Sequence, residues 1–342
     1  MKGEKNSMDK RERMLAFIGN EKVDRVPVGF WHHFVSFHDH FGYKDPAILK
    51  TVVDGQKRYI DEVNPDFLKI MSDAFFGHPS VCKKLIKTAD DLAEITSVGP
   101  DHDWITGQIE YVKDICAYAG DGMPKLYNIF SPLQYIRLRF EEYDEDDLKF
   151  TNLFRAHPDV MVAAGKAIEK DVLTLVHRLF EETSIDGIYY SVQSVQKGVF
   201  DREGHRKYVE PLDLSVLNAI NEHSKHNMLH ICGYHGLFTN DLTWYTEYPA
   251  QIMNWAVHSE HVSLKEGKKL FGGRAVIGGF DNAPGSLIYT GTDEEIRKEI
   301  VSILDEAGTV GVGIGADCTI DMNLPVARME LARTVAKEYG SR

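Results

Sequence analysis

The chain has 342 residues, of which 43% are hydrophobic and 27% are charged, the ordinary balance of a globular protein. These proportions exclude a mostly disordered chain, and the length suits either about two domains or one large α/β barrel. Lys and Arg number 39 against 52 Asp and Glu, and the resulting net charge of −13 repels phosphate backbones. Nucleic acid is therefore not expected as a partner.

The N-terminal segment and the cysteine content indicate a cellular compartment. Residues 1–20 are charged and then amphipathic, without the apolar core of a signal peptide. No apolar run approaches the roughly 20 residues that a membrane span needs. The chain has four cysteines, too few for a disulfide framework. We expect a cytoplasmic protein with no membrane partner, in which a functional cysteine is a metal ligand or a reactive thiol.

Short apolar, β-branched or aromatic segments alternate with longer segments of helical periodicity. Apolar residues recur at helical spacing over Pro158–Thr183, and Thr292–Ala307 opens with a capping box formed by Thr292 and Glu295. The predicted strands are Val26–Trp31, Asp66–Ser72, Lys125–Ser131, Gly187–Gln193, Asn227–Gly233, Gln251–His258, Ala275–Asp281 and Gly311–Asp317.

Eight strands that alternate with helices predict a closed (β/α)8 barrel, here a single domain over residues 1–342 with an N-terminal helical extension. A doubly wound open sheet is the structural alternative. A dinucleotide-binding protein of that kind needs a glycine turn after its first strand. The residues VPVGFWHHF at this point lack such a turn, so the barrel is the prediction.

Polar or reactive side chains stand at the carboxyl ends of most predicted strands. In a barrel these ends meet at one mouth, where enzymes with this fold carry out their chemistry. In chain order these residues are His32, His33, Asp73, Gln193, His230, Cys232, His258, Asp281, Asp317 and Cys318.

His230 and Cys232 are two residues apart on the fifth predicted strand, so both side chains lie on the same face. Cys318 follows the eighth predicted strand, which opens onto the same barrel mouth. One imidazole and two thiolates suit Zn²⁺, and three protein ligands leave a fourth position for a substrate. Each cysteine taken singly is more often a small buried side chain. Their combination at strand ends favours a zinc site.

A zinc ion bound by two thiolates captures an incoming thiol and holds it as the thiolate at neutral pH. A thiolate held in this way is a good methyl acceptor. Hydrolysis by a zinc-bound water is the alternative, but zinc hydrolases favour histidine and carboxylate ligands. The ligand set therefore predicts methyl transfer ahead of hydrolysis.

Three further strand-end residues are predicted to be catalytic. Asp73 is either an acid–base group or substrate anchor, or else the cap of the following helix. His258 and Asp281 are expected to complete the zinc coordination or to orient His230. Asn254 is not expected to bind zinc, because an amide is a poor zinc ligand.

Several segments, in order along the chain, resemble the uroporphyrinogen decarboxylase superfamily. The opening RERMLAFIGNEKVDRVPVGFW is similar to the family's N-terminal helix, glycine, Asp-Arg-x-Pro and first strand. DFLKIMSD, which ends at Asp73, resembles the strand whose aspartate is catalytic in the decarboxylases. IFSPLQY, GIYYSVQS and GGRAVIGGFDN resemble the family's third-, fourth- and seventh-strand regions. The resemblance extends from Arg11 to Ala336 and implies a (β/α)8 barrel.

The resemblance distinguishes two branches of the superfamily. The decarboxylases hold the acidic side chains of their porphyrinogen with an arginine-rich loop after the first strand, but His32–His38 contains no arginine. The other branch comprises corrinoid-dependent methyltransferases, whose thiol-accepting members bind zinc through His-x-Cys and a distant Cys. LHICG and GADC match this motif, which implies that His230, Cys232 and Cys318 are the zinc ligands.

The corrinoid-binding motif Asp-x-His-x-x-Gly does not occur in the chain. The resemblance therefore implies that a methylated corrinoid arrives on a partner protein. The implied acceptor is a small thiol similar to coenzyme M or homocysteine, or tetrahydrofolate. We thus predict a zinc-dependent methyltransferase. The alternatives are a decarboxylase that uses Asp73 without metal, and a non-catalytic barrel that binds a corrinoid or porphyrin.

Five residues are predicted to contact the substrate. The histidines among them have two other interpretations, a second metal site or a solvated loop. Tyr190 follows Tyr189 on a strand, so one of the two rings faces the barrel interior and the other faces the core outside it. The predicted contacts are His32, His33, Tyr135, Tyr190 and Gln193.

Overall fold

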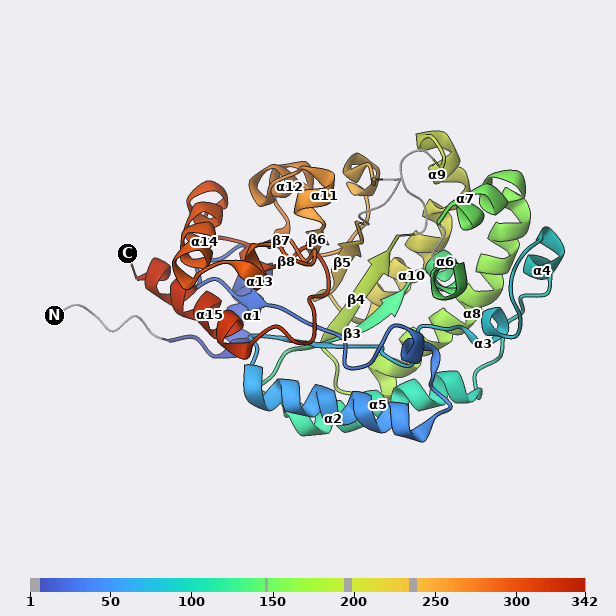
Figure 1. The fold of residues 1–342 in the computed structure, drawn as a ribbon, viewed down its shortest axis with the longest axis horizontal. Helices are drawn as coiled ribbons and strands as arrows, with labels where there is room; N and C mark the ends of the chain where they lie inside the picture. The colour runs from blue at the N-terminus through green and yellow to red at the C-terminus, as the bar shows by residue number, and fades with distance from the viewer. Residues whose placement is uncertain (1–6, 145–146, 194–198, 234–238, 342) are drawn as a thin grey trace.

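The computed structural model describes residues 7–144, 147–193, 199–233 and 239–341. Eight parallel strands form one sheet in the order β1-β8-β7-β6-β5-β4-β3-β2, bent into a nearly closed barrel (Figure 1). They are β1 (Val28–Gly29), β2 (Leu68–Ile70), β3 (Lys125–Phe130), β4 (Gly187–Val192), β5 (Met228–Ile231), β6 (Ile252–Trp255), β7 (Ala275–Phe280) and β8 (Val312–Ala316). The predicted barrel is confirmed, and each strand lies within its predicted segment.

Helices lie around the outside of the strands (Figure 1). The longer helices are α1 (Lys10–Ile18), α2 (Pro46–Val63), α5 (Asp103–Ala119), α6 (Pro132–Asp144), α7 (Asp147–Ala156), α8 (Pro158–Glu182), α10 (Glu210–His223), α14 (Asp293–Ala307) and α15 (Val326–Gly340). The shorter ones are η1 (His38–Phe41), α3 (Pro79–Cys82), α4 (Ala89–Ala93), α9 (Arg202–Tyr208), η2 (Leu242–Tyr245), α11 (Val257–Glu260), α12 (Leu264–Leu270) and α13 (Leu287–Thr290). Among the helices in the described ranges, none has an apolar stretch of the length that crossing a bilayer requires.

Local sequence signals set where the two predicted helices begin. α8 starts at Pro158, whose fixed φ suits the first helical position. α14 starts after Thr292, whose backbone N–H donates to Glu295 at 2.7 Å while its hydroxyl accepts from the Glu295 backbone N–H at 3.3 Å. The predicted capping box is therefore confirmed.

Side chains alternate between the inside and the outside of the barrel, as the two-residue period of a strand requires. Tyr189 pairs in register with Met228, and Ser191 pairs with His230 two residues further on. The first pair belongs to an apolar cluster, from which the Tyr189 ring also reaches the cavity that the second pair lines. The apolar cluster also contains Met14 and Phe17 of α1, and Phe67, Leu126, Ile252, Ala275 and Ile277 from around the barrel. α1 thus packs at the amino end of the barrel, and the polar cavity lies toward the carboxyl end.

The first two strands are linked by side chains. Within the described residues no backbone ladder pairs β1 with β2. Instead, Asp66 accepts a hydrogen bond from the Val28 backbone N–H at 2.8 Å. Both carboxylate oxygens of Asp66 also accept from Arg25 at 2.6 Å. Arg13 of α1 donates to Asp66 at 3.0 Å and to both oxygens of Asp24 at 2.8 Å. The Asp-Arg pair of the N-terminal motif therefore joins α1 to the first two strands.

Replacing Asp66 by Asn is expected to destabilise the protein by about 3–5 kcal/mol, because two largely buried guanidinium groups lose their shared carboxylate. The free energy of unfolding in urea measures this effect. Asp54→Asn is the control, since Asp54 is in an exposed pair with Lys50 and its loss is expected to change stability by less than about 0.5 kcal/mol. Equal effects of the two substitutions would contradict the proposed linking role.

Candidate metal centre

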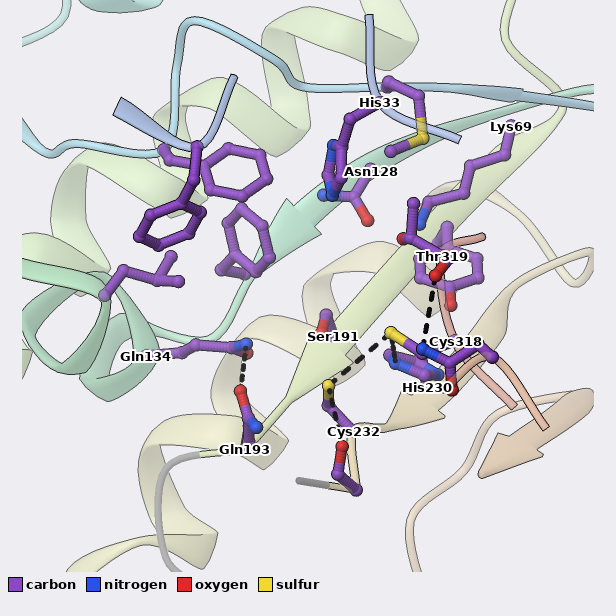
Figure 2. A pocket seen from close by; sticks show the side chains of 18 residues that line it. His33, Lys69, Asn128, Gln134, Ser191, Gln193, His230, Cys232, Cys318 and Thr319 are labelled. Atoms are coloured by element: carbon purple, nitrogen blue, oxygen red, sulfur yellow. Dashed lines mark hydrogen bonds between the residues drawn. The ribbon is translucent and has the colours of Figure 1, made fainter. Parts of the chain in front are cut away.

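Three of the predicted site residues converge at the carboxyl ends of β5 and β8. His230 is the third residue of β5, Cys232 directly follows that strand, and Cys318 lies two residues after β8. Cys318 Sγ is 3.4 Å from His230 Nε2 and 3.8 Å from Cys232 Sγ. Figure 2 shows the two sulfur atoms pointing toward one another, with the His230 ring beside Cys318. The three ligand atoms all lie within 4.8 Å of one another.

These separations suit a tetrahedral zinc ion. With bonds of about 2.3 Å to sulfur and about 2.0 Å to nitrogen, tetrahedral Zn²⁺ separates two sulfur ligands by about 3.8 Å. The same bond lengths separate a sulfur from a nitrogen ligand by about 3.5 Å. The distances between Cys318 and its two neighbours match both values. The residues present therefore fit the metal in number, chemistry and spacing.

Asn254 of β6 orients the His230 imidazole. The Asn254 side-chain Nδ2 donates to the carbonyl oxygens of Ile277 and Ala316 at 2.8 and 3.3 Å, which fixes the amide with Oδ1 toward His230. His230 Nδ1 lies 2.5 Å from that oxygen, so we assign the proton to Nδ1. The Nε2 lone pair then points toward Cys318, as metal binding requires. The residue that orients His230 is thus Asn254, to which the sequence assigned no role.

The thiol of Cys318 lies in an environment that favours its ionised form. The hydrogen bond with Cys232, together with the nearby His230 and Lys69, holds the pKa of Cys318 well below its ordinary value. Burial acts in the opposite direction but does not prevail. Cys318 is therefore suited to be a thiolate ligand, the form that binds metals.

A cavity of about 390 Å³ lies beside the three candidate ligands. Its walls combine aromatic rings with a few polar groups, the usual composition of a small-molecule site. Figure 2 shows the polar groups distributed around the cavity. Besides His230, Cys232 and Cys318, the lining includes His33, Phe37, Lys69, Phe76, Asn128, Phe130, Gln134, Tyr189, Ser191, Gln193 and Thr319.

Lys69 is a lining residue that the sequence reasoning missed. It is the middle residue of β2 and is only 6% exposed. Its ammonium lies over the Tyr189 ring, with Nζ 3.8 Å from the ring centroid. Burial lowers the pKa of Lys69 to about 8. A lysine within the otherwise apolar segment FLKIM, at an inward position between Phe67 and Met71, was the signal that could have identified it.

Asp73 acts on the cavity through His33. Its Oδ1 lies 2.7 Å from His33 Nδ1, and its Oδ2 accepts from the Phe34 backbone N–H at 2.7 Å. Burial acts to raise the pKa of Asp73, but the contacts with His33, His40 and the Phe34 amide lower it overall. The following helix, α3, has His78 as its N-cap, so Asp73 does not cap that helix. The buried carboxylate orients His33, which lines the cavity.

His258 and Asp281 lie apart from the ligand cluster. His258 Nδ1 is 2.9 Å from Asp317 Oδ2, and this hydrogen bond raises the pKa of His258. Asp281 Oδ1 accepts from the Ala283 backbone N–H at 2.8 Å. Neither is among the described ligand atoms that lie within 4.8 Å of one another around Cys318. Their assignment as catalytic residues stays a prediction.

The predicted substrate contacts lie in different places. His33 and Gln193 line the cavity. His32 lines a second cavity with Tyr59, and His33 contributes to that cavity as well. Tyr135 of α6 and Tyr190 of β4 are fully buried in the core outside the barrel. For Tyr190 the reason is strand alternation, which places the Tyr189 ring on the inner face. The prediction that the two neighbouring tyrosines face opposite sides is confirmed. A role of Tyr135, Tyr190 or His32 in substrate binding stays a prediction.

The sequence is similar to those of two archaeal methyltransferases. No family model matches the chain. Over 264 residues, it is 23% identical to the methylcobamide:CoM methyltransferase MtbA of Methanosarcina acetivorans, covering 76% of this chain and 72% of that protein. The MtbA of Methanosarcina mazei is 24% identical with the same coverage. The chain is a distant relative of these methyltransferases. The predicted resemblance and the predicted enzyme class, a methyltransferase, are thereby confirmed.

A solved structure agrees at the level of the fold. A methyltransferase from Methanosarcina mazei superposes with a TM-score of 0.69 at 14% sequence identity, covering 97% of this chain and 99% of that one. Since the sequence identity is low, this likeness shows the shared barrel fold.

Substituting Asn254 by Leu is expected to weaken zinc binding about 10- to 100-fold, because His230 loses the acceptor that orients its ring. Competition with a chromophoric chelator measures the zinc affinity of the purified protein. Asn128→Leu is a matched control, since Asn128 is also a buried amide lining the cavity but bonds Ser72 instead of a ligand. Equal zinc affinities for the two variants would show that Asn254 does not position His230.

Proposed function

We propose that this methyltransferase is zinc-dependent and transfers a methyl group from a methylated corrinoid, carried by a partner protein, to a small thiol. The observation that carries the proposal is the cluster of His230, Cys232 and Cys318 beside a cavity, in which Cys318 lies at tetrahedral separations from the other two ligand atoms. The distant relatives named methylcobamide:CoM methyltransferase support the corrinoid donor and the thiol acceptor. The lack of an Asp-x-His-x-x-Gly motif supports a separate corrinoid protein.

The chain's residues would hold the metal with one coordination position left for the acceptor. A Zn²⁺ ion bound by His230, Cys232 and Cys318 supplies Lewis acidity, which lowers the pKa of a coordinated thiol. Two thiolates also balance the charge of the ion, so the ligand set is electron-rich and favours nucleophilic attack by the acceptor sulfur. The methyl carbon exchanges its bond to cobalt for a bond to sulfur, and the electron pair of the broken bond stays on the cobalt.

His33 and Asp73 can take up the proton that the acceptor thiol loses. Asp73 accepts the Nδ1 hydrogen of His33 at 2.7 Å, which leaves a lone pair on Nε2. His33 lines the same cavity as the candidate ligands. In this proposal the Asp73 carboxylate orients the His33 imidazole, and the imidazole accepts the proton.

Metal analysis of untagged protein tests the ligand set. About one zinc ion per chain is expected, with loss of zinc in both Cys232→Ser and Cys318→Ser, because each serine removes a thiolate ligand. Cys82→Ser is the control and is expected to keep the metal, since Cys82 belongs to α3 and a different cavity. A wild-type protein that stays zinc-free after zinc is added back would overturn the proposal.

Turnover with methylcobalamin as a free donor tests the reaction. The zinc-loaded protein is expected to convert a small thiol to its methyl thioether, detected by mass spectrometry, and both ligand variants are expected to lose this activity. If the protein methylates tetrahydrofolate and not the thiol, the proposed thiol acceptor is wrong and the acceptor is tetrahydrofolate. A metal-independent decarboxylation abolished by Asp73→Asn would instead support the decarboxylase alternative.

A further inference from the structure

A second cluster of metal-binding side chains lies beside the cavity. His33 and His40 belong to the segment between β1 and α2, and Asp73 is the third residue after β2. Their ligand atoms all lie within 4.8 Å of one another. Among the described residues, this cluster and the three candidate zinc ligands are the two groups of this kind. In Figure 2 the His33 ring lies apart from His230 and the two cysteines, so the two clusters are distinct.

His40 is a buried imidazole whose hydrogen-bonding capacity is not used. It is only 1% exposed, and neither ring nitrogen makes a hydrogen bond of ordinary geometry with a described residue. The Val35 carbonyl and Asp73 act on the ring, but Asp73 Oδ2 is 3.8 Å from Nε2. Burial lowers the pKa of His40 to about 3, so the ring is neutral. A neutral imidazole with a free lone pair is the form that binds metals.

The chemistry and the spacing of the three residues fit zinc. Two imidazoles and one carboxylate are a common ligand set for this ion, and tetrahedral Zn²⁺ separates such ligand atoms by about 3.3 Å. The Asp73 carboxylate is 2.7 Å from His33 Nδ1 and 3.8 Å from His40 Nε2, on either side of this value. Shifts of about half an ångström bring both contacts to it. The partly exposed His33 side chain has room to move.

We propose that His33, His40 and Asp73 form a second site for Zn²⁺, separate from the cysteine-containing site. It is the weaker of the two sites, because it supplies one anionic ligand in place of two. The charges of Lys69 and Asp73 also act on each other, so the Lys69 ammonium opposes a further cation there. We therefore expect the second site to fill only when zinc is in excess, whereas the purified protein keeps about one ion.

Zinc at the second site is expected to inhibit the enzyme. This consequence rests on the proposed function, in which His33 Nε2 accepts the proton of the thiol, but the site itself does not. Without metal, His33 carries its proton on Nδ1 beside Asp73. A metal ion bound to Nδ1 uses the lone pair of that nitrogen, so the proton of the neutral ring moves to Nε2. Nε2 then has no lone pair for the substrate proton.

Cobalt(II) titration of the Cys232→Ser/Cys318→Ser double variant tests the second site by itself, because this variant lacks both thiolates. It is expected to bind about one cobalt ion per chain, with visible d–d bands but no sulfur-to-cobalt charge-transfer absorption. Adding His40→Phe keeps a ring packed against Phe37 and Phe76 but removes a ligand. This change is expected to weaken cobalt binding by more than the roughly 10- to 100-fold that loss of a supporting group costs.

His38→Phe in the same double variant is the matched control. His38 is an exposed histidine of the same short helix, η1, and belongs to neither described cluster of ligands, so cobalt binding is expected to be unchanged. His33→Ala removes a ligand at a partly exposed position and replaces His40→Phe if the melting temperature shows that His40→Phe does not fold. A double variant that binds no cobalt, or binds it equally without one of these ligands, would overturn the second site.

Methyl transfer in zinc-buffered solutions tests the inhibition, because a chelator then fixes free zinc in the presence of the thiol. Each protein's rate in excess zinc is divided by its own rate with one zinc ion per chain. This ratio is expected to fall about 100-fold in the wild type and in His38→Phe, the lower end of what a positioned base contributes. In His40→Phe it is expected to stay near one, and an equal fall there would overturn the inhibitory role.

The two experiments separate the second site from the proposed function. Cobalt binding that depends on His40, in a protein that transfers no methyl group to a thiol, would support the second site and overturn the proposed function. Methyl transfer by a protein whose double variant binds no cobalt would do the reverse.

Discussion

Closure of eight parallel strands into a barrel is the constraint on which the rest of this structure depends. Because side chains alternate along each strand and neighbouring strands pair in register, a residue's level in the barrel is set by its position on its strand. Met228 therefore contributes to the apolar cluster that α1 packs against, and His230, two residues later, reaches the polar cavity. Asn254 pairs in register with His230 on the neighbouring strand, so its side chain points into the barrel at the same level. Its Oδ1 can therefore accept the hydrogen bond from the His230 imidazole.

Charged and ionisable side chains from different parts of the barrel meet in the cavity. Cys232 and Cys318 lie at one end of the cavity with His230, and the buried ammonium of Lys69 belongs to the same wall. On the other side, the Asp73 carboxylate is enclosed by His33, His40 and the Phe34 amide, so it affects a ligand only through the His33 imidazole. The cavity thus brings together three candidate ligands for a soft metal, a buried ammonium and an imidazole oriented by a carboxylate.

Local patterns in the sequence predicted much of this arrangement. All eight strands and the capping box of α14 follow from apolar segments, turn residues and hydrogen-bonding caps that act over a few residues. The His-x-Cys spacing was informative because it depends only on the two-residue period of one strand. Tyr190 illustrates the limit of this reasoning, since alternation requires adjacent residues to face opposite sides but does not say which of them faces inward.

The sequence by itself determined the fold class, the strand segments and the three candidate ligands, because these depend on local periodicity and on ligand chemistry. Only the tertiary structure decided which groups support those ligands. Asn254 orients His230, Asp73 acts through His33, and Lys69 has no counter-ion among the described residues. These relationships join residues from different strands, and their distances are set by barrel closure, for which no short stretch of sequence carries a signal.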